Sequence, residues 1–251
     1  MGKDKQMKTI GIVGFGIIGQ ALVNWLKANT SHKLLISDPL KGYVCDLSLC
    51  DIVFINIHIP TEKNGIQNLE VLEHIISELP NVPIYIRTTI LPGTADYLSI
   101  KFHKKIYFMP EFLTERTAQD DFDKQTLVYT GNIRLLKSVF INKKYITMSN
   151  TEAEIAKYAH NVFGALKVTY FNAIYDLCLK KKINYKNVLS GILLSGYIDK
   201  NHTTVPGPDG KLGFGGKCFP KDVDAFSNYI KSEPLYELVK SIKKLNNIFR
   251  K

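Results

Sequence analysis

The feature that most restricts the fold is an alternation, over the first 148 residues, of short apolar runs with segments of helical periodicity. An apolar run at 10–13 ends in glycines, and in 17–26 the residues Ile18, Leu22 and Leu26 recur at helical spacing. Such alternation is typical of a mostly parallel sheet with helices on both faces. The sequence therefore predicts a doubly wound α/β fold. The other elements expected here are strands at 34–36, 52–59, 84–86, 106–109 and 127–129 and a helix at 68–79.

Near residue 149 the pattern changes to helices alone. Residues 152–182 contain no proline and a single glycine, Gly164. This predicts one helix of about 45 Å at a rise of 1.5 Å per residue. A helix of that length is too long for one small domain to bury, so we expect it to lead into a small, all-helical second domain. We further expect a Gly- and Pro-rich loop at 205–216, helices from Pro220 and over 235–249, and domains at 1–148 and 149–251.

Composition and charge restrict the class of protein. The 251 residues are 45% apolar and 22% charged, as in ordinary globular proteins. No apolar run approaches the ~20 residues that span a bilayer, and residues 1–8 lack the apolar core of a signal peptide. We therefore expect a cytoplasmic protein with no membrane partner. The net charge of +10 suits an anionic ligand, although a solvated lysine-rich surface is the simpler explanation. Nucleic acid is not expected, because no binding motif accompanies the lysines.

A glycine-rich turn follows the first predicted strand. It has the pattern GxGxxG, in which the glycines allow a tight turn, close approach of a pyrophosphate and close packing of helix on strand. A phosphate then lies against the N–H groups that open the helix. Asp38 ends the second predicted strand 19 residues after the last glycine, where a carboxylate accepts hydrogen bonds from ribose hydroxyls and repels a 2′-phosphate. The sequence thus predicts a Rossmann-like domain that binds NAD through Gly14, Phe15, Gly16, Ile17, Ile18, Gly19 and Asp38.

The segment 213–222, GFGGKCFPKD, carries the strongest indication of chemistry. Pro220 suits the first turn of a helix, which places Cys218 at the positive end of that helix. Lys217 and Lys221 add positive charge nearby. These influences lower the pKa of a thiol and favour the nucleophilic thiolate. Asp222 follows Cys218 by one helical turn, so both are expected on the same side.

The other three cysteines lack such surroundings. Cys45, Cys50 and Cys178 are therefore expected to be small buried apolar residues. Four irregularly spaced cysteines are too few for a disulfide scaffold, and we expect free thiols. The six histidines are scattered, with none at ligand spacing from another His or Cys, so no metal site is predicted.

Further polar residues fall at positions suited to a site. Lys157 and Asn161 share one face of the long helix, flanked by an expected apolar stripe at 158, 159, 162 and 163. A solvated helix face is the alternative, but beside an activated cysteine the pair suits donation to a developing oxyanion. Glu111 and Glu115 follow one predicted strand, and Thr88 and Thr89 follow another, so both groups can reach the crevice at the strand ends. For the two glutamates the alternative is a charged surface loop.

Four segments, 110–115, 154–161, 170–172 and 213–222, together resemble the nucleotide-sugar 6-dehydrogenases, the UDP-glucose/GDP-mannose dehydrogenase family. The similarity runs through nearly the whole chain in the same order. It implies a four-electron oxidation of a sugar CH2OH to a carboxylate with reduction of two NAD+. The aldehyde would be captured by Cys218 as a thiohemiacetal, which is oxidised to a thioester and hydrolysed. UDP-glucose is the first candidate substrate.

The resemblance also implies roles for single residues. Lys157 and Asn161 would stabilise the alkoxide and the tetrahedral oxyanion, and Asp222 would act with Lys157 on an ordered water. Glu115 would be the base for thioester hydrolysis, with Thr89 helping to hold a water. The positions near NAD would be Lys41, Thr61, Thr89 and Lys221. The substrate would contact Glu111, Phe112, Leu113, Lys157, Asn161, Lys211, Gly213 and Gly215, within a loop at 207–216 that wraps the sugar nucleotide.

The chain also departs from the family pattern. The family usually continues into a third α/β domain, so this sequence resembles a short form without it. Lys217 stands where the family often has a small residue, and at 199–201 the sequence Asp-Lys-Asn lacks the arginine that family members place after an aspartate.

Two other functions stay open. A two-domain dehydrogenase of the β-hydroxyacid type shares the architecture but gives Cys218 no role. A non-catalytic NAD- or nucleotide-binding protein would bind the cofactor without forming NADH. The long apolar helix and the small helical domain also lead us to expect a homodimer.

Overall fold

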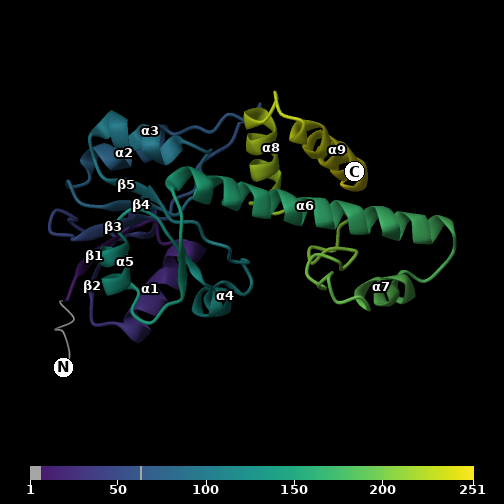
Figure 1. The fold of residues 1–251 in the computed structure, drawn as a ribbon, viewed down its shortest axis with the longest axis horizontal. Coiled ribbons are helices and arrows are strands. Elements are labelled where there is room, and N and C mark those ends of the chain that lie inside the picture. Colours follow the sequence, from purple (N-terminus) through teal and green to yellow (C-terminus); the bar gives the residue numbers. More distant parts are fainter. Residues whose placement is uncertain (1–6, 63) are drawn as a thin grey trace. The chain divides into compact units, whose positions relative to one another are not determined.

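The structure, a computed structural model, describes residues 7–62 and 64–251. Its internal contacts divide the chain into two compact units (Figure 1). The first comprises Met1–Pro60 and Gln67–Lys157, and the second comprises Thr61–Ile66 and Tyr158–Lys251. The sequence-based division after residue 148 stays a prediction. Each unit is described below by itself.

A five-stranded, wholly parallel sheet forms the centre of the first unit. The strand order is β2-β1-β3-β4-β5. The chain therefore reverses direction across the sheet between β1 and β3, the kind of switch point at which ligands bind in open α/β folds. This confirms the predicted α/β fold. The strands are β1 Thr9–Val13, β2 Lys33–Ser37, β3 Ile52–Ile55, β4 Ile84–Ile86 and β5 Ile106–Phe108.

Helices cover both faces of this sheet, because neighbouring strand residues point to opposite sides. Ile12 and Phe54 pack in one core with the residues of α1, α4 and α5. Val13 and Ile55 pack in the other core with those of α2 and α3 (Figure 1). The helices are α1 Ile17–Asn29, α2 Glu70–Glu78, α3 Thr94–Phe102, α4 Ala118–Lys124 and α5 Ile133–Val139, with a short 3-10 turn, η1, at Pro39–Lys41.

The strand predicted at 127–129 forms, but not in the main sheet. It is β6, Leu127–Tyr129, which pairs in parallel with β7, Tyr145–Thr147, as a separate two-stranded sheet. The sequence did not indicate β7, because two of its three residues are exposed and give no apolar run. The short helices α3, α4 and α5 were missed because they have only seven to nine residues, about two helical turns, which is too short for a helical periodicity to be recognised.

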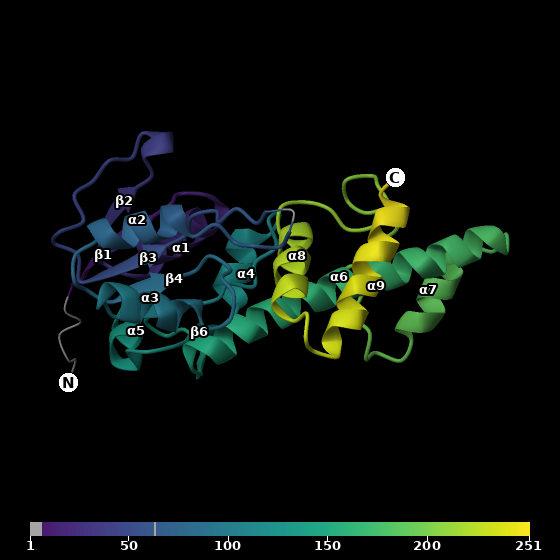
Figure 2. The same ribbon diagram turned by 90° about the horizontal axis from the view of Figure 1, so that it is seen from above.

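Helices make up the regular structure described in the second unit. Helix α6, Asn150–Lys180, is a single helix of 31 residues, as predicted, and its residues from Tyr158 onward belong to this unit. Helices α7 and α9 both lie beside it (Figures 1 and 2). The predicted helices after Pro220 and at 235–249 are confirmed, and α7 was not predicted. The remaining bounds are α7 Tyr185–Leu193, α8 Phe219–Tyr229 and α9 Leu235–Phe249.

The start of α6 is held in the first unit by a buried carboxylate. Glu154 is fully buried, and its two oxygens accept hydrogen bonds from the backbone N–H groups of Gly93, at 2.6 Å, and Ala95, at 2.9 Å. These groups lie at the N-terminus of α3, which offers unpaired donors. Burial raises the pKa of the Glu154 carboxyl to about 7, although the two N–H groups act in the opposite direction.

We predict that Glu154 makes the protein less stable as the pH rises from 5 to 7.5. In this range the folded carboxyl holds a proton that the unfolded one has lost, so the free energy of unfolding falls with rising pH. Replacement Glu154→Gln should reduce this fall, whereas Glu237→Gln, at an exposed position of α9, should not. Urea unfolding at the two pH values measures both. An unchanged pH dependence in Glu154→Gln would contradict the prediction.

Candidate functional site

The predicted glycine-rich turn joins β1 to α1. Gly14 has φ +84, and a Cβ there would lie 2.8 Å from the carbonyl oxygen of Asn56. A Cβ on Gly19 would lie 2.2 Å from the oxygen of Gly14. Both positions therefore require glycine for the backbone to close. A Cβ on Gly16 would meet nothing within 4 Å, so the space above the start of α1 is open.

Asp38 and Lys41 both contact this turn. Asp38 follows β2 directly, and its Oδ2 accepts a hydrogen bond from the backbone N–H of Phe15 at 2.8 Å. Lys41 Nζ donates to the carbonyl oxygen of Phe15 at 2.7 Å. The open cradle at Gly16, the start of α1 without a side-chain cap and the adjacent carboxylate fit a dinucleotide, with its pyrophosphate at the helix N-terminus.

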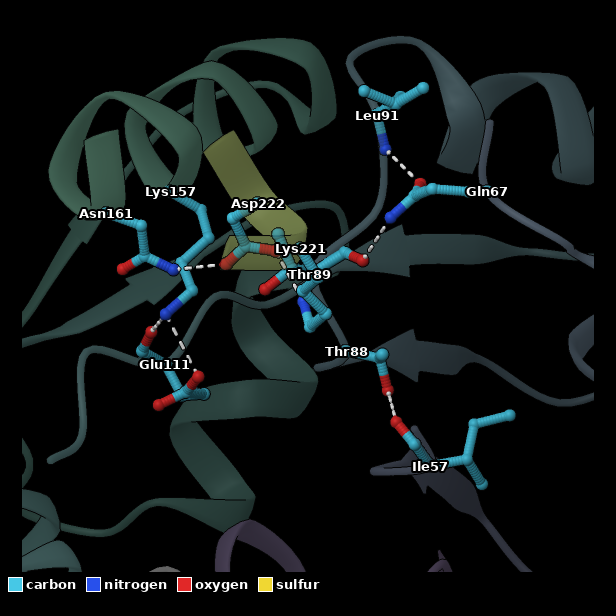
Figure 3. Close-up of polar contacts among 10 residues, drawn as sticks. All are labelled: Ile57, Gln67, Thr88, Thr89, Leu91, Glu111, Lys157, Asn161, Lys221 and Asp222. Carbon is cyan, nitrogen blue, oxygen red and sulfur yellow. Dashed lines mark hydrogen bonds and ion pairs between the residues drawn. The ribbon is translucent and has the colours of Figure 1, made fainter. Parts of the chain in front are cut away.

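Lys157 and Glu111 form a buried ion pair within the first unit (Figure 3). Lys157 Nζ lies 2.9 Å from Glu111 Oε1 and also donates to the Glu111 carbonyl, and it lies 5.4 Å from the centre of the Phe112 ring. The two residues are 4% and 6% exposed. The alternatives of a solvated helix face for Lys157 and a surface loop for Glu111 are therefore wrong.

The charge of Glu111 is maintained by its surroundings. Burial raises the pKa of this carboxyl, but the Lys157 ammonium, the N–H of Leu113 and the Arg87 guanidinium outweigh it, so the pKa lies below its ordinary value. Glu111 Oε2 accepts the Leu113 N–H at 2.8 Å. The cluster therefore holds an ionised carboxylate that is paired with Lys157 and also stabilised by the charge of Arg87.

Arg87 is the residue of this cluster that the sequence analysis missed. It follows β4 and is fully buried, with Nη1 donating to Asn56 Oδ1 at 3.2 Å and its guanidinium 5.2 Å from the Phe122 ring centre. Its Nε and Nη2 have no hydrogen-bond partner. Burial lowers the pKa of Arg87 to about 10, opposed by the charge of Glu111. A charged residue directly after a buried strand was the available signal.

The second unit contains a further buried cluster, on α6 and α8 (Figure 3). Asn161 Nδ2 donates to Asp222 Oδ2 at 2.6 Å, and the Lys221 ammonium pairs with Asp222 Oδ1. Asn161 is 5% exposed and Asp222 is fully buried. The alternative of a solvated helix face is thus wrong for Asn161 as well. Asp222 N–H also donates to the Cys218 carbonyl at 3.0 Å, the first bond of α8.

Cys218 is the N-cap residue of α8, as the sequence analysis expected, and it is exposed. Cys50 and Cys178 are buried, as expected, and burial raises the pKa of the Cys50 thiol to about 11. The expectation for Cys45 is wrong, because it is exposed in the segment after β2.

The expected apolar stripe on α6 is correct only in part. Tyr158 is fully buried, stacked on Phe226 at 5.2 Å, and Val162 is 6% exposed. Ala159 is exposed, and Phe163 is 64% exposed. The buried face of α6 is therefore partly polar, which spacing alone could not reveal because polar and apolar residues alternate around the helix.

The remaining predicted residues fall into three groups. Thr88 and Thr89, which follow β4, are both buried. Thr88 Oγ1 donates a hydrogen bond to the Ile57 carbonyl at 2.6 Å (Figure 3). The Thr89 carbonyl accepts one from Gln67 Nε2 at 3.1 Å. Glu115 and Lys211 are exposed, whereas Gly213 is buried. Thr61 and Lys221 belong to the second unit, so their place at the cofactor stays a prediction. In residues 7–62 and 64–251 no three His, Cys, Asp or Glu side chains gather as a metal site.

Comparison with known proteins identifies relatives along most of the chain. Residues 151–248 match the central domain of the UDP-glucose/GDP-mannose dehydrogenase family. A UDP-glucose 6-dehydrogenase of Rickettsia typhi is 30% identical over 240 residues, 86% of this chain and 54% of that protein. A UDP-glucose dehydrogenase of Pyrobaculum islandicum has a TM-score of 0.84 at 21% identity, covering 99% of this chain and 70% of that one. The 3-hydroxyisobutyrate dehydrogenase of Mycobacterium tuberculosis has a TM-score of 0.68 at 16% identity, covering 98% and 96%.

The structural likenesses show that the chain has the fold of these dehydrogenases. The resemblance expected from the motifs is confirmed: residues 151–248 are a central domain of the UDP-glucose/GDP-mannose dehydrogenase family. The chain spans about half the length of the curated relatives it matches. In the part of the chain that the structure describes, none of the helices is long and apolar enough to cross a membrane.

We predict that Lys157→Met lowers the free energy of unfolding by about 3 kcal/mol, because it leaves a buried carboxylate without its partner. The double variant Lys157→Met/Glu111→Gln should recover part of the loss, since the charge is then removed too. Urea unfolding measures both. The control is Lys101→Met, which breaks a solvent-exposed pair with Glu73 and should change the stability little. Equal effects of the two single variants would contradict the buried pair.

Proposed function

We propose that the chain carries an NAD-dependent oxidation of the C6 hydroxymethyl group of a nucleotide sugar, UDP-glucose being the first candidate, to a carboxylate. The observation that carries the proposal is the exposed thiol of Cys218 at the start of α8, one turn before the buried Asp222 that Asn161 binds. A fold with a dinucleotide-type glycine turn and relatives named UDP-glucose 6-dehydrogenase support it.

The reaction needs a nucleophile because an aldehyde cannot lose a second hydride until a group has added to its carbon. The alcohol first loses a proton and a hydride to give the aldehyde. The Cys218 thiolate adds to the carbonyl carbon, forming a C–S bond and a thiohemiacetal alkoxide. Loss of a second hydride gives a thioester, and water then cleaves the C–S bond to give the carboxylate and the thiol. Covalent capture splits a difficult oxidation into easier steps and retains the aldehyde.

NAD is the cofactor that the first unit fits best. Gly14, Gly16 and Gly19 form the turn for the pyrophosphate, and Asp38 and Lys41 lie against that turn. Bound NAD+ supplies the hydride acceptor, with two molecules reduced per carboxylate formed. The carboxylate of Asp38 favours NAD over NADP, because it repels a 2′-phosphate.

In this proposal, polar residues on α6 and the residues that contact them transfer the protons and stabilise the developing negative charge. Lys157 and Asn161 lie one turn apart on this helix, and their N–H donors suit an oxyanion of the sugar carbon. Asp222 is the partner that holds the Asn161 amide in place. Glu115 is exposed, which leaves its carboxylate accessible as the base that activates water for thioester hydrolysis, with Thr89 proposed to help hold that water. The loop at 207–216, with Lys211, Gly213 and Gly215, is proposed to wrap the sugar nucleotide.

The decisive measurement is NADH formation by the purified protein with NAD+ and a panel of UDP- and GDP-sugars. Two NADH per uronate would support the proposed reaction. Turnover with small hydroxy acids instead would favour a β-hydroxyacid dehydrogenase. Cofactor binding without NADH from any substrate would favour a binding protein.

We predict that Cys218→Ser abolishes sustained formation of two NADH per sugar, because the serine hydroxyl is a far weaker nucleophile than a thiolate. The matched control is Cys45→Ser, at the other exposed cysteine, which should keep the wild-type rate. NADH absorbance with product analysis measures both. A Cys218→Ser enzyme that still makes the uronate at the wild-type rate would exclude the covalent mechanism.

We also propose that the protein is a homodimer through α6. Phe163, Tyr170 and Leu177 follow one another at intervals of seven residues and are 64%, 52% and 50% exposed. A seven-residue repeat places them along one side of the helix, and a stripe of this kind is self-complementary when two copies meet about a twofold axis.

Replacement of Tyr170 by Lys is therefore expected to yield monomers, because it places a charge in the middle of the stripe. Light scattering after gel filtration measures the mass, with Tyr236→Lys, on α9, as the control that should remain dimeric. A wild-type monomer would contradict the proposed dimer.

A further inference from the structure

The loop at 207–216 ends two residues before Cys218. Within its first half, the N–H of Gly207 donates to the Lys211 carbonyl at 2.8 Å and the N–H of Gly210 to the Gly207 carbonyl at 2.9 Å. The N–H of Lys211 also donates to Asp209 Oδ1 at 3.1 Å. Five of its ten residues are glycine, which have the largest conformational entropy to lose when ordered. No helix or strand includes it. Its second half, which leads to Cys218, is held by groups from other elements of the second unit.

Asn246 of α9 supplies the central contact. Its Oδ1 accepts the backbone N–H of Phe214 at 2.7 Å, and its Nδ2 donates to the carbonyl of the same residue at 3.1 Å. One amide thus fixes both peptide groups around Phe214. Asn246 is 8% exposed and Phe214 is 5% exposed, so both are largely shielded from solvent. Buried backbone groups need such partners, since leaving them unpaired costs about 1–3 kcal/mol each.

Two further side chains hold the same loop. Arg250, one turn after Asn246, donates from Nε to the Phe214 carbonyl at 3.0 Å and from Nη2 to Asp209 Oδ2 at 2.8 Å. Asn172 of α6 accepts the N–H of Gly213 through Oδ1 at 2.9 Å. The loop is thus bonded at its start, through Asp209, and near its end.

The glycines of the loop are matched to these side chains. A Cβ at Gly213 would lie 2.4 Å from Asn246 Oδ1, and one at Gly215 would lie 1.4 Å from Arg250 Nη2. Gly213 also has φ +69. The close approach of α9 to the loop therefore requires glycine at both positions.

Phe214 also contacts the residue that follows Cys218. Its ring packs edge-on against Phe219 at 6.2 Å, and Phe219 directly follows Cys218. Phe219 in turn lies against Gly164 of α6, where a Cβ would come within 2.6 Å of its ring. Cys218 thus lies between Phe214, held by α9, and Phe219, held by α6.

We infer that Asn246 and Arg250 are positioning residues of α9 that hold the glycine-rich loop in the conformation that presents Cys218 at the start of α8. The catalytic meaning of this inference rests on the proposed function. The geometric part does not, because the position and reactivity of the thiol can be measured without turnover.

The test compares Asn246→Leu with Asn247→Leu. The two changes are the same and adjacent on α9, but Asn247 is exposed and Asn246 is buried. Because Asn246→Leu carries some risk of misfolding, Arg250→Met and Arg250→Lys form a second pair at a less buried position. Arg250→Lys keeps a cationic donor, so it should recover part of what Arg250→Met loses. Circular dichroism and thermal unfolding establish that each variant is folded.

The first readout is the rate at which iodoacetamide alkylates Cys218 as a function of pH, followed by mass spectrometry of its peptide. Asn246→Leu and Arg250→Met should shift the pH midpoint up by about one unit, because the thiol is displaced from the helix N-terminus that favours the thiolate. Asn247→Leu should leave the midpoint unchanged, and Cys45, alkylated in the same sample, is the internal reference.

The second readout is NADH formation. In Asn246→Leu, kcat should fall about 10- to 100-fold, the scale of a nucleophile misplaced by about 1 Å, with the KM for NAD+ unchanged. An alkylation midpoint unchanged in folded Asn246→Leu and Arg250→Met would overturn the inference, whatever the activity. A shifted midpoint in a protein that forms no NADH would support the positioning role and count against the proposed function alone.

Discussion

Each of the two units contains a stretch of helix α6 that buries polar side chains against that unit's own residues. Along α6 the residues Glu154, Lys157, Asn161 and Asn172 are each 5% exposed or less. Burying such groups is costly unless each finds a partner, and each does. The first two are paired within the first unit, with the α3 N-terminus and with Glu111, and the last two within the second, with Asp222 and the glycine-rich loop. The orientation of α6 about its own axis is therefore specified by polar contacts in both units.

The charged and polar side chains along α6 have partners of different charge in the two units. In the first, one carboxylate, Glu111, lies under the influence of two cations, Lys157 and Arg87, so the cluster keeps a net positive charge. In the second, Asp222 is paired with Lys221 and bound by the neutral amide of Asn161. A buried excess of positive charge favours an anion, and the proposed alkoxide is such a group. Arg87 contributes to this balance without touching solvent.

The segment around Cys218 shows why so many glycines precede the cysteine. A glycine has no side chain, which allows a ligand to approach the backbone. Here two of the glycines, Gly213 and Gly215, also allow Asn246 and Arg250 of α9 to approach the loop backbone closely. A loop that is flexible by composition is thereby held by three polar side chains from two helices. In the proposed reaction, this combination would leave the loop backbone accessible to the sugar nucleotide and hold it firmly enough to orient the Cys218 thiol.

The sequence by itself determined the α/β fold of the first unit, the glycine turn with Asp38, the single long helix and the place of Cys218 at a helix start. These follow from local patterns: periodicity, glycine spacing, and the position of Pro220. Only the tertiary structure decided which polar residues are buried. Spacing could not separate the buried Glu111 from the exposed Glu115 and could not show that Lys157 and Asn161 are buried while Phe163 is exposed. It also gave no reason to select Asn246. Burial depends on partners distant in sequence, such as Phe214 and Asn246, which are 32 positions apart. No local pattern records those partners.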